Sequence, residues 1–183
     1  QGKSIEELER LEAERLAEEE RKRKEEEERI RKLEEERRKK EEMKRNQSIE
    51  NMLWPIPASS RVTSKFGYRK APTAGASTFH QGIDVGAARG TEVIAAIAGT
   101  VKKAGYNSTS GYHVVIDHGD GVETKYLHAS KLLVKVGEYV QRGQPIIKVG
   151  STGVSTGPHL HFGLFINGVA VDPLKYVTYE NKE

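Results

Sequence analysis

The sequence predicts a mainly β fold, in which a domain of short strands follows one long, charged α-helix. Residues 1–50 hold 16 lysines and arginines and 18 aspartates and glutamates, and they contain no aromatic residue. Residues 51–183 instead contain short runs of β-branched and aromatic residues separated by glycines, a pattern typical of strands joined by turns. We therefore expect two domains, a charged helical arm over residues 1–50 and a globular domain over residues 51–183.

The composition limits the kinds of partner and site. The 183 residues include no cysteine, which excludes disulfides and thiolate zinc sites. No apolar run approaches the ~20 residues that span a bilayer, so we expect no membrane span in this chain. No signal peptide is visible, and the start at Gln1 suggests a processed or trimmed piece of a longer protein. Residues 51–183 carry 14 basic and nine acidic side chains, a surplus that favours a weakly anionic partner such as a cell-wall polymer over a nucleic acid.

The arm is predicted to form one helix from Ser4 to about residue 46. Ser4 and Glu7 form a capping box, in which each side chain bonds a backbone amide of the other residue. Strong helix formers follow, and neither glycine nor proline occurs again before Pro55. Between Glu18 and Glu41, ten glutamates stand four residues before a lysine or arginine, an orientation that stabilises an isolated helix. The polar run 46–48 then interrupts the pattern, so we expect the helix to end there.

The apolar positions of the arm favour a solvated single helix over an obligate coiled coil. Ile5 and Leu8 begin a heptad pattern, but no apolar residue occurs between Ala17 and Ile30. A coiled coil needs regular apolar positions throughout its length. The first turns are still able to pair with another helix, so self-association or an envelope protein partner stays open.

The globular domain is predicted to consist of strands and hairpins. A polar segment, residues 70–78, is expected to form a surface loop of the kind that lines a site. Residues 119–121 (Gly-Asp-Gly) and 167–168 (Asn-Gly) predict tight hairpin turns. Strands are expected over residues 61–66, twice within 90–101, over 112–122 and 122–128, and on either side of a turn within 134–150.

Two histidines two residues apart form the first candidate site. A Gly-Pro turn at residues 157–158 precedes an apolar run that is typical of a buried strand. Residues two apart in a strand point to the same face, so we expect His159 and His161 to lie side by side while Leu160 enters the core. Two parallel imidazoles suit metal ligation, or one ligand beside an acid–base group. On its own, however, a His-x-His motif more often marks two structural or exposed histidines.

A second pair of candidate ligands supplies the missing partners. His80 and Asp84 are four residues apart, and Gly82 between them permits a bend that lets both side chains reach one ion. Alone, this pair also fits a surface histidine and a turn carboxylate. Together with the histidine pair it offers three ligands and an open fourth position, the usual arrangement of a catalytic zinc site.

Three further histidines occur in the domain. His113 within a predicted strand and His118 beside a turn are expected to be structural or exposed. His128 ends a predicted strand just before a loop, a place where functional side chains often lie. The pattern alone leaves the role of His128 undecided.

Three segments in this order carry a resemblance to a known family: His80-x-x-x-Asp84, Tyr126-Leu127-His128 and Gly157-Pro158-His159-Leu160-His161-Phe162. Together they closely resemble the lysostaphin/LytM-type zinc endopeptidases, bacterial enzymes that cut peptide cross-links of peptidoglycan. The resemblance covers about residues 58–177 and does not include the arm. It implies a largely antiparallel β-sheet domain with zinc in a groove flanked by loops, one of which is the 70–78 loop.

The resemblance also assigns roles by position: the zinc ligands are His80, Asp84 and His161, and the catalytic, non-ligand histidines are His128 and His159. Zinc in such a site leaves one position for water, lowers the pKa of that water and polarises the scissile carbonyl. The two catalytic histidines take the water's proton or stabilise the oxyanion, and the sequence does not divide these roles between them. Some members carry a tyrosine in the loop that assists the transition state. Residues 70–78 contain none, and we do not assign that role to Tyr68.

Two other functions stay open. Helical arms also precede this domain in envelope regulators whose metal sites are degenerate and which activate separate amidases. Such a chain would be a non-catalytic cell-wall-binding module, but the five site residues present here favour an enzyme. Alternatively, the arm is the functional part, a spacer or oligomerisation rod. The peptidoglycan substrate predicts a location in the bacterial cell envelope or outside the cell, whereas the bond cut, in a glycine bridge or a direct bond from D-alanine, is not predicted.

Overall fold

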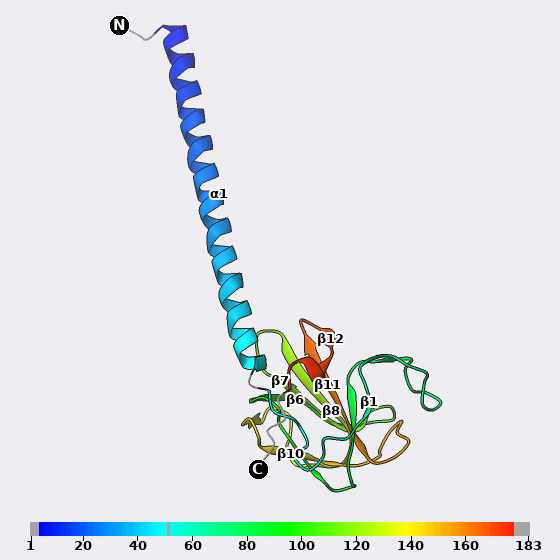
Figure 1. The fold of residues 1–183 in the computed structure, drawn as a ribbon. Helices are drawn as coiled ribbons and strands as arrows, with labels where there is room; N and C mark the ends of the chain where they lie inside the picture. Colours follow the sequence, from blue (N-terminus) through cyan, green and yellow to red (C-terminus); the bar gives the residue numbers. More distant parts are fainter. Residues whose placement is uncertain (1–3, 51, 178–183) are drawn as a thin grey trace. The chain divides into compact units, whose positions relative to one another are not determined.

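The computed structural model describes residues 4–50 and 52–177 (Figure 1). The chain divides into two compact units, residues up to Met43 and residues from Lys44 onward. The first unit is formed by the helix α1, which spans Ile5–Glu50, and the second contains the last turns of that helix and the strands. Among the described residues, no helix is both long and apolar enough to cross a membrane.

The helix α1 begins as the capping pattern predicts. The backbone N–H of Glu7 donates to the Ser4 hydroxyl at 3.4 Å and to the Ser4 carbonyl at 3.1 Å. Exposed ion pairs three or four residues apart follow along the helix, such as Glu18–Lys22 and Glu35–Lys39, each 2.7 Å long. The apolar side chains of the first turns are exposed, which agrees with a solvated helix.

The predicted helix end is wrong by four residues, because α1 continues to Glu50. The side chain of Ile49 is buried and belongs to the hydrophobic core of the second unit. Burial of an isoleucine outweighs the weak helix propensity of the polar residues before it. The helix therefore ends where the core begins rather than where the charge pattern stops.

The second unit is built almost entirely of strands. Their bounds are β1 Val62–Ser64, β2 Gly67–Tyr68, β3 Phe79–His80, β4 Ile83–Gly86, β5 Glu92–Ile94, β6 Gly99–Asn107, β7 Gly111–Asp117, β8 Val122–Leu132, β9 Tyr139–Val140, β10 Pro145–Val149, β11 His159–Ile166 and β12 Val169–Val171, followed by a 3₁₀ turn over Pro173–Lys175. The predicted hairpins are present. Asn167 and Gly168 have φ of 51° and 77°, the positive values that a two-residue hairpin turn requires.

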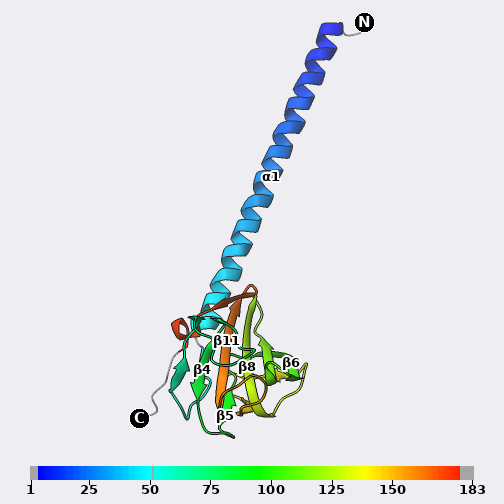
Figure 2. The same cartoon turned by 90° about the vertical axis from the view of Figure 1, so that its right-hand side faces the viewer.

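Ten of these strands form one antiparallel sheet, in the order β1-β4-β11-β8-β7-β6-β9, with β12 beside β11 and with β10 between β8 and β5. Figure 2 shows β4, β11 and β8 side by side. The strands β2 and β3 form a separate pair. The predicted mainly β, antiparallel fold with one long helix is confirmed.

The strand β11 separates the core from the site. Along it, Leu160 and Phe162 are fully buried, while His159 and His161 alternate with them and are mostly buried on the opposite face. This alternation confirms that the two histidines share one face, as their spacing predicts. The apolar face of β11 packs against Tyr126 of β8, whose ring centroid lies 5.3 Å from that of Phe162.

Candidate active site

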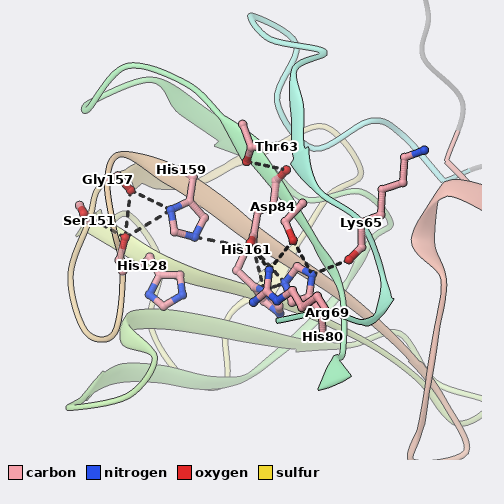
Figure 3. A network of polar contacts seen from close by, with 12 residues as sticks. Thr63, Lys65, Arg69, His80, Asp84, His128, Ser151, Gly157, His159 and His161 are labelled. Carbon is pink, nitrogen blue, oxygen red and sulfur yellow. Dashed lines mark hydrogen bonds and ion pairs between the residues drawn. The ribbon is translucent and has the colours of Figure 1, made fainter. Parts of the chain in front are cut away.

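Three side chains from three strands meet at one point on this face of the sheet (Figure 3). Asp84 of β4 lies directly opposite His161 of β11 in the antiparallel register, and His80 enters from β3. The Nε2 of His80, the Oδ1 of Asp84 and the Nδ1 of His161 lie 2.9–3.1 Å from one another. The sheet and the separate β2–β3 pair therefore bring together the three predicted ligands.

Gly82 makes this approach possible for a steric reason. The chain bends at residues 81–82 between β3 and β4, as the sequence suggests. A Cβ at Gly82 would lie 2.3 Å from the carbonyl oxygen of Phe162 and 2.9 Å from the Nε2 of His161. Glycine is thus required because β11 passes close by, and any larger residue would displace a ligand.

The hydrogen bonds around the cluster fix which atoms face one another. The Nδ1 of His80 donates to the carbonyl of Lys65 at 2.8 Å, which leaves the lone pair of Nε2 for the cluster. Arg69 binds the other carboxylate oxygen of Asp84, with its Nη1 3.0 Å from Oδ2, so Oδ1 is the oxygen directed at the histidines. Two imidazole nitrogens and one carboxylate oxygen form a donor set suited to Zn²⁺.

The charges of the cluster also suit a divalent cation. Burial opposes ionisation of Asp84, but hydrogen bonds and positive charge from His161 and His80 outweigh it and hold the pKa of Asp84 far below its ordinary value. Burial lowers the pKa of His161, although Asp84 opposes this shift. At neutral pH the cluster therefore contains a carboxylate and a neutral imidazole, the protonation states that bind a metal ion.

His128 lies inside β8 and not at its end, so the predicted strand end is wrong. It has a φ of 65°, in the left-handed region that is rare for a residue other than glycine. Tyr112 and Val114 of β7, two residues apart, pair with Ala129 and Tyr126 of β8, which are three residues apart. The extra residue in β8 makes a β-bulge. Bulges redirect side chains next to functional sites. This one places the ring of His128 4.8 Å from the ring of His159.

Both non-ligand histidines are held through Nδ1. The Nδ1 of His128 donates to the carbonyl of Thr152 at 2.8 Å, and that of His159 to the carbonyl of Gly157 at 2.8 Å. In each ring Nε2 is thereby the atom able to accept a proton, and the Nε2 of His159 lies 3.6 Å from the Oδ1 of Asp84. Burial lowers the pKa of His128 to about 4, against the opposing effect of its bond to Thr152, so its ring is neutral at neutral pH.

Two hollows meet at the cluster and together form a groove. The first, of about 740 Å³, is lined by the 70–78 loop and by the turn before β11, as well as by Asp84 and His159. The second, of about 500 Å³, extends along the same sheet face to Phe165. Arg69, His128 and His161 line both hollows. The 70–78 loop contains neither helix nor strand and forms one wall, as predicted.

This arrangement agrees with a match to a known protein family. The model of peptidase family M23 matches residues 78–173, which is more than half of the chain and includes every residue of the cluster. The chain belongs to peptidase family M23. The matched region begins just before β3 and ends after β12, so it contains the strands that carry the five histidine and aspartate site residues.

Relatives of this M23 chain include proteins named as peptidoglycan enzymes. The peptidoglycan DD-endopeptidase ShyC of Vibrio cholerae is 44% identical over 114 residues, which are 62% of this chain and 26% of ShyC. The chain thus spans about a quarter of the length of that relative. A zinc-containing peptidase from Vibrio cholerae is 36% identical, with a TM-score of 0.63 over 68% of this chain and 39% of that one. Lysostaphin from Staphylococcus simulans is 31% identical, with a TM-score of 0.62 over 72% and 56%.

The other histidines of the M23 domain lie away from the cluster. His118 is held by the Ala98 carbonyl at 2.8 Å and by the Thr124 hydroxyl at 2.7 Å, and burial lowers its pKa. This contact set agrees with the structural role predicted for it. His113 binds the Gly111 carbonyl at 3.0 Å and lines the second hollow.

Sequence reasoning missed one residue of the site, Arg69. Its guanidinium binds both Asp84 and the hydroxyl of Ser64, and its backbone N–H bonds the Thr78 carbonyl at 2.8 Å, which closes the base of the 70–78 loop. Nothing in the spacing of Arg69 relates it to Asp84, fifteen residues later. Arg69 directly follows β2, and its contact with Asp84 links the separate β2–β3 pair to β4.

Proposed function

We propose that this M23 domain is a zinc-dependent endopeptidase that hydrolyses peptide cross-links of bacterial peptidoglycan. One observation carries the proposal: the two imidazoles and the carboxylate converge within 2.9–3.1 Å at the middle of a groove, beside two further histidines with free Nε2 atoms. Three ligands with an open side are typical of catalytic zinc sites. The names of the relatives supply the substrate class.

The ligand residues would be His80, Asp84 and His161. When bound there, Zn²⁺ supplies Lewis acidity and lowers the pKa of water towards neutrality. Arg69 keeps one oxygen of Asp84 occupied, so the carboxylate offers its other oxygen in a fixed orientation. The Lys65 carbonyl does the same for the ring of His80.

The proton steps fall to His128 and His159. The attacking water gives its proton to an imidazole Nε2, and the same imidazole returns it to the amine nitrogen as the amide bond breaks. The second imidazole, when protonated, stabilises negative charge on the former carbonyl oxygen. Burial keeps the ring of His128 neutral at neutral pH and its Nδ1 is bonded to Thr152, so its Nε2 lone pair is available and we assign it the role of the base.

We also propose that residues 1–50 serve the peptidase domain of residues 51–183 as a solvated spacer, with a location in the cell envelope or outside the cell. The exposed side chains and local ion pairs of α1 support the spacer. Peptidoglycan as substrate supports the location. Self-association through the first turns of the helix is the alternative, and mass measurements over a range of concentrations would detect it.

Mass spectrometry of muropeptides tests the function. The zinc-loaded chain is incubated with purified peptidoglycan of defined cross-link types, beside the His161→Ala variant as control. We expect new peptide termini that a chelator prevents and added zinc restores. Intact cross-links in every wall, despite bound zinc, would contradict the enzyme and favour a regulator that activates a separate amidase.

A further inference from the structure

The groove carries an unbalanced charge. Five cationic side chains line the two hollows, namely Arg61, Arg69, Lys70, Lys103 and Lys125. Among the described residues that line the hollows, Asp84 is the only carboxylate, and Arg69 and the histidines already engage it. The positive charge of the groove therefore exceeds what the metal centre requires, and it suits anionic groups of a ligand.

Lys125 is the cation whose surroundings are most specific. It lies on β8 opposite Gly163 of β11, on the face that also presents His161. Its Nζ stands 3.6 Å from the centroid of the Phe165 ring, and the side chain is half-buried in the second hollow. Burial lowers the pKa of Lys125; the carboxylate of Glu123 opposes this shift, and the neighbouring Lys103 adds to it. A carboxylate that reaches this position would stabilise the charged form of the ammonium.

The protein itself does not supply that carboxylate. Glu123, two residues before Lys125 on β8, forms an ion pair with Lys102 instead. In the described part of the chain, no carboxylate lies within salt-bridge distance of Lys125. The half-buried ammonium is held over the Phe165 ring in the hollow that His161 also lines, so its charge is available to an anionic group from outside the chain.

We propose that the second hollow is a carboxylate-binding subsite, in which Lys125, assisted by Lys103, holds a free carboxylate of the substrate close to the scissile amide. His161 lines the same hollow, so a carboxylate at Lys125 and an amide at the metal centre belong to one short ligand. This inference rests on the proposed function and narrows its substrate.

The subsite distinguishes two kinds of cross-link. In a direct bond from D-alanine to the second α-amino group of a diamino dicarboxylic acid, the carbon that bears the amide nitrogen also bears a free carboxylate. A glycine bridge has no charged group within it. The subsite therefore selects direct cross-links whose carboxylate is free, and it discriminates against glycine bridges and against cross-links whose carboxylate is amidated.

Two matched synthetic peptides test this inference. Both contain the same D-alanyl amide to a D-amino acid, and they differ only in whether that amino acid ends in a carboxylate or a carboxamide. With the zinc-loaded full chain, we expect kcat/KM to be about tenfold or more higher for the carboxylate, the size of one charge-assisted hydrogen bond. Lys125→Met keeps the hydrocarbon stem over Phe165 and should bring the ratio close to one. Lys125→Arg keeps the charge and should retain the preference.

The control is Lys131→Met, since Lys131 is exposed on the same strand and lines neither hollow; it should leave the ratio unchanged. Equal kcat/KM for both peptides in the wild type, or an undiminished preference in Lys125→Met, would overturn the subsite while leaving the endopeptidase intact. Cleavage of neither peptide would instead count against the proposed function. Calorimetric titration of the same peptides then tests the subsite without turnover. Tighter binding of the carboxylate peptide that is lost in Lys125→Met supports the subsite, and equal binding of the two peptides refutes it.

Discussion

The helix α1 and the sheet of the second unit are stabilised over very different distances along the chain. In α1, the ion pairs join residues three or four apart, and their side chains are exposed. In the sheet, His161 bonds Asp84 across 77 positions of sequence, and both side chains are mostly buried. Order in the helix is therefore local, and a change there affects about one turn. A change in the sheet affects groups from several strands at once, so substitutions in the two regions should differ greatly in effect.

Removal of a predicted ligand should show the largest effect. His161→Ala removes one of three convergent ligand atoms, so we expect the chain to lose zinc binding and, with it, peptidase activity. Metal content after dialysis, measured by mass spectrometry, checks the first outcome. His159→Ala is the matched control, because that histidine lies on the same face two residues away and should leave zinc bound. Full zinc content in His161→Ala would contradict the ligand assignment.

His128→Ala should separate chemistry from metal binding. The variant keeps all three ligands, so zinc content should be unchanged, while loss of the proton acceptor should lower turnover by about 10²–10⁴-fold. Comparing kcat with zinc stoichiometry on the same preparation measures both. Turnover close to that of the wild type would remove His128 from the mechanism.

Arg69→Ala should have an intermediate effect, since Arg69 acts through Asp84. Loss of the guanidinium frees Oδ2 and lets the carboxylate rotate, so we expect zinc affinity to fall about 10–100-fold, as for other groups that orient a ligand. Competition with a chromogenic chelator measures the dissociation constant. Lys70→Ala, next in sequence and also in the groove, should leave zinc affinity unchanged. An equal loss in both variants would point to the loop and not to the contact with Asp84.

The difference between contacts of neighbouring residues and contacts of residues far apart in the sequence explains what could be predicted from sequence. Capping at Ser4 and the pairing of glutamates with bases depend on neighbours in the chain, so the helix was predictable up to the point where Ile49 enters the core. The shared face of His159 and His161 follows from strand alternation alone. These local rules predict most of the fold class and the two short motifs that contain the proposed ligands.

The rest of the site depends on how distant strands are paired. The bulge at His128 exists because β7 and β8 differ by one residue in register at that point. The contact of Arg69 with Asp84 and the position of Lys125 over Phe165 require the pairing of strands that no local pattern specifies. For the same reason, the resemblance in sequence could assign His128 a role but not its place inside a strand.

The buried network at His118 should make the stability of the sheet depend on pH. Burial lowers the pKa of His118 in the folded state below its ordinary value of about 6.5. Between these two values the unfolded chain binds more protons, so the free energy of unfolding falls as the pH decreases through this window, and it is unaffected above about pH 7.5. With zinc chelated, urea titrations at pH 7.5 and 5.5 should show a larger loss in the wild type than in His118→Gln. Equal losses would mean that other groups carry the dependence.

The smallest effect is expected in the helix. Glu35→Gln removes the carboxylate that pairs with Lys39 at 2.7 Å, but both side chains are exposed and the neighbouring turns keep their own pairs. We expect a slight decrease in ellipticity at 222 nm that disappears in about 1 M salt, because at that ionic strength charges are screened within about 3 Å. Zinc content and turnover should not change, since the pair joins two residues of α1 and includes none of the site residues. A measurable loss of turnover would instead show that the arm takes part in catalysis, and the contrast between a local helix and a non-local site would no longer hold.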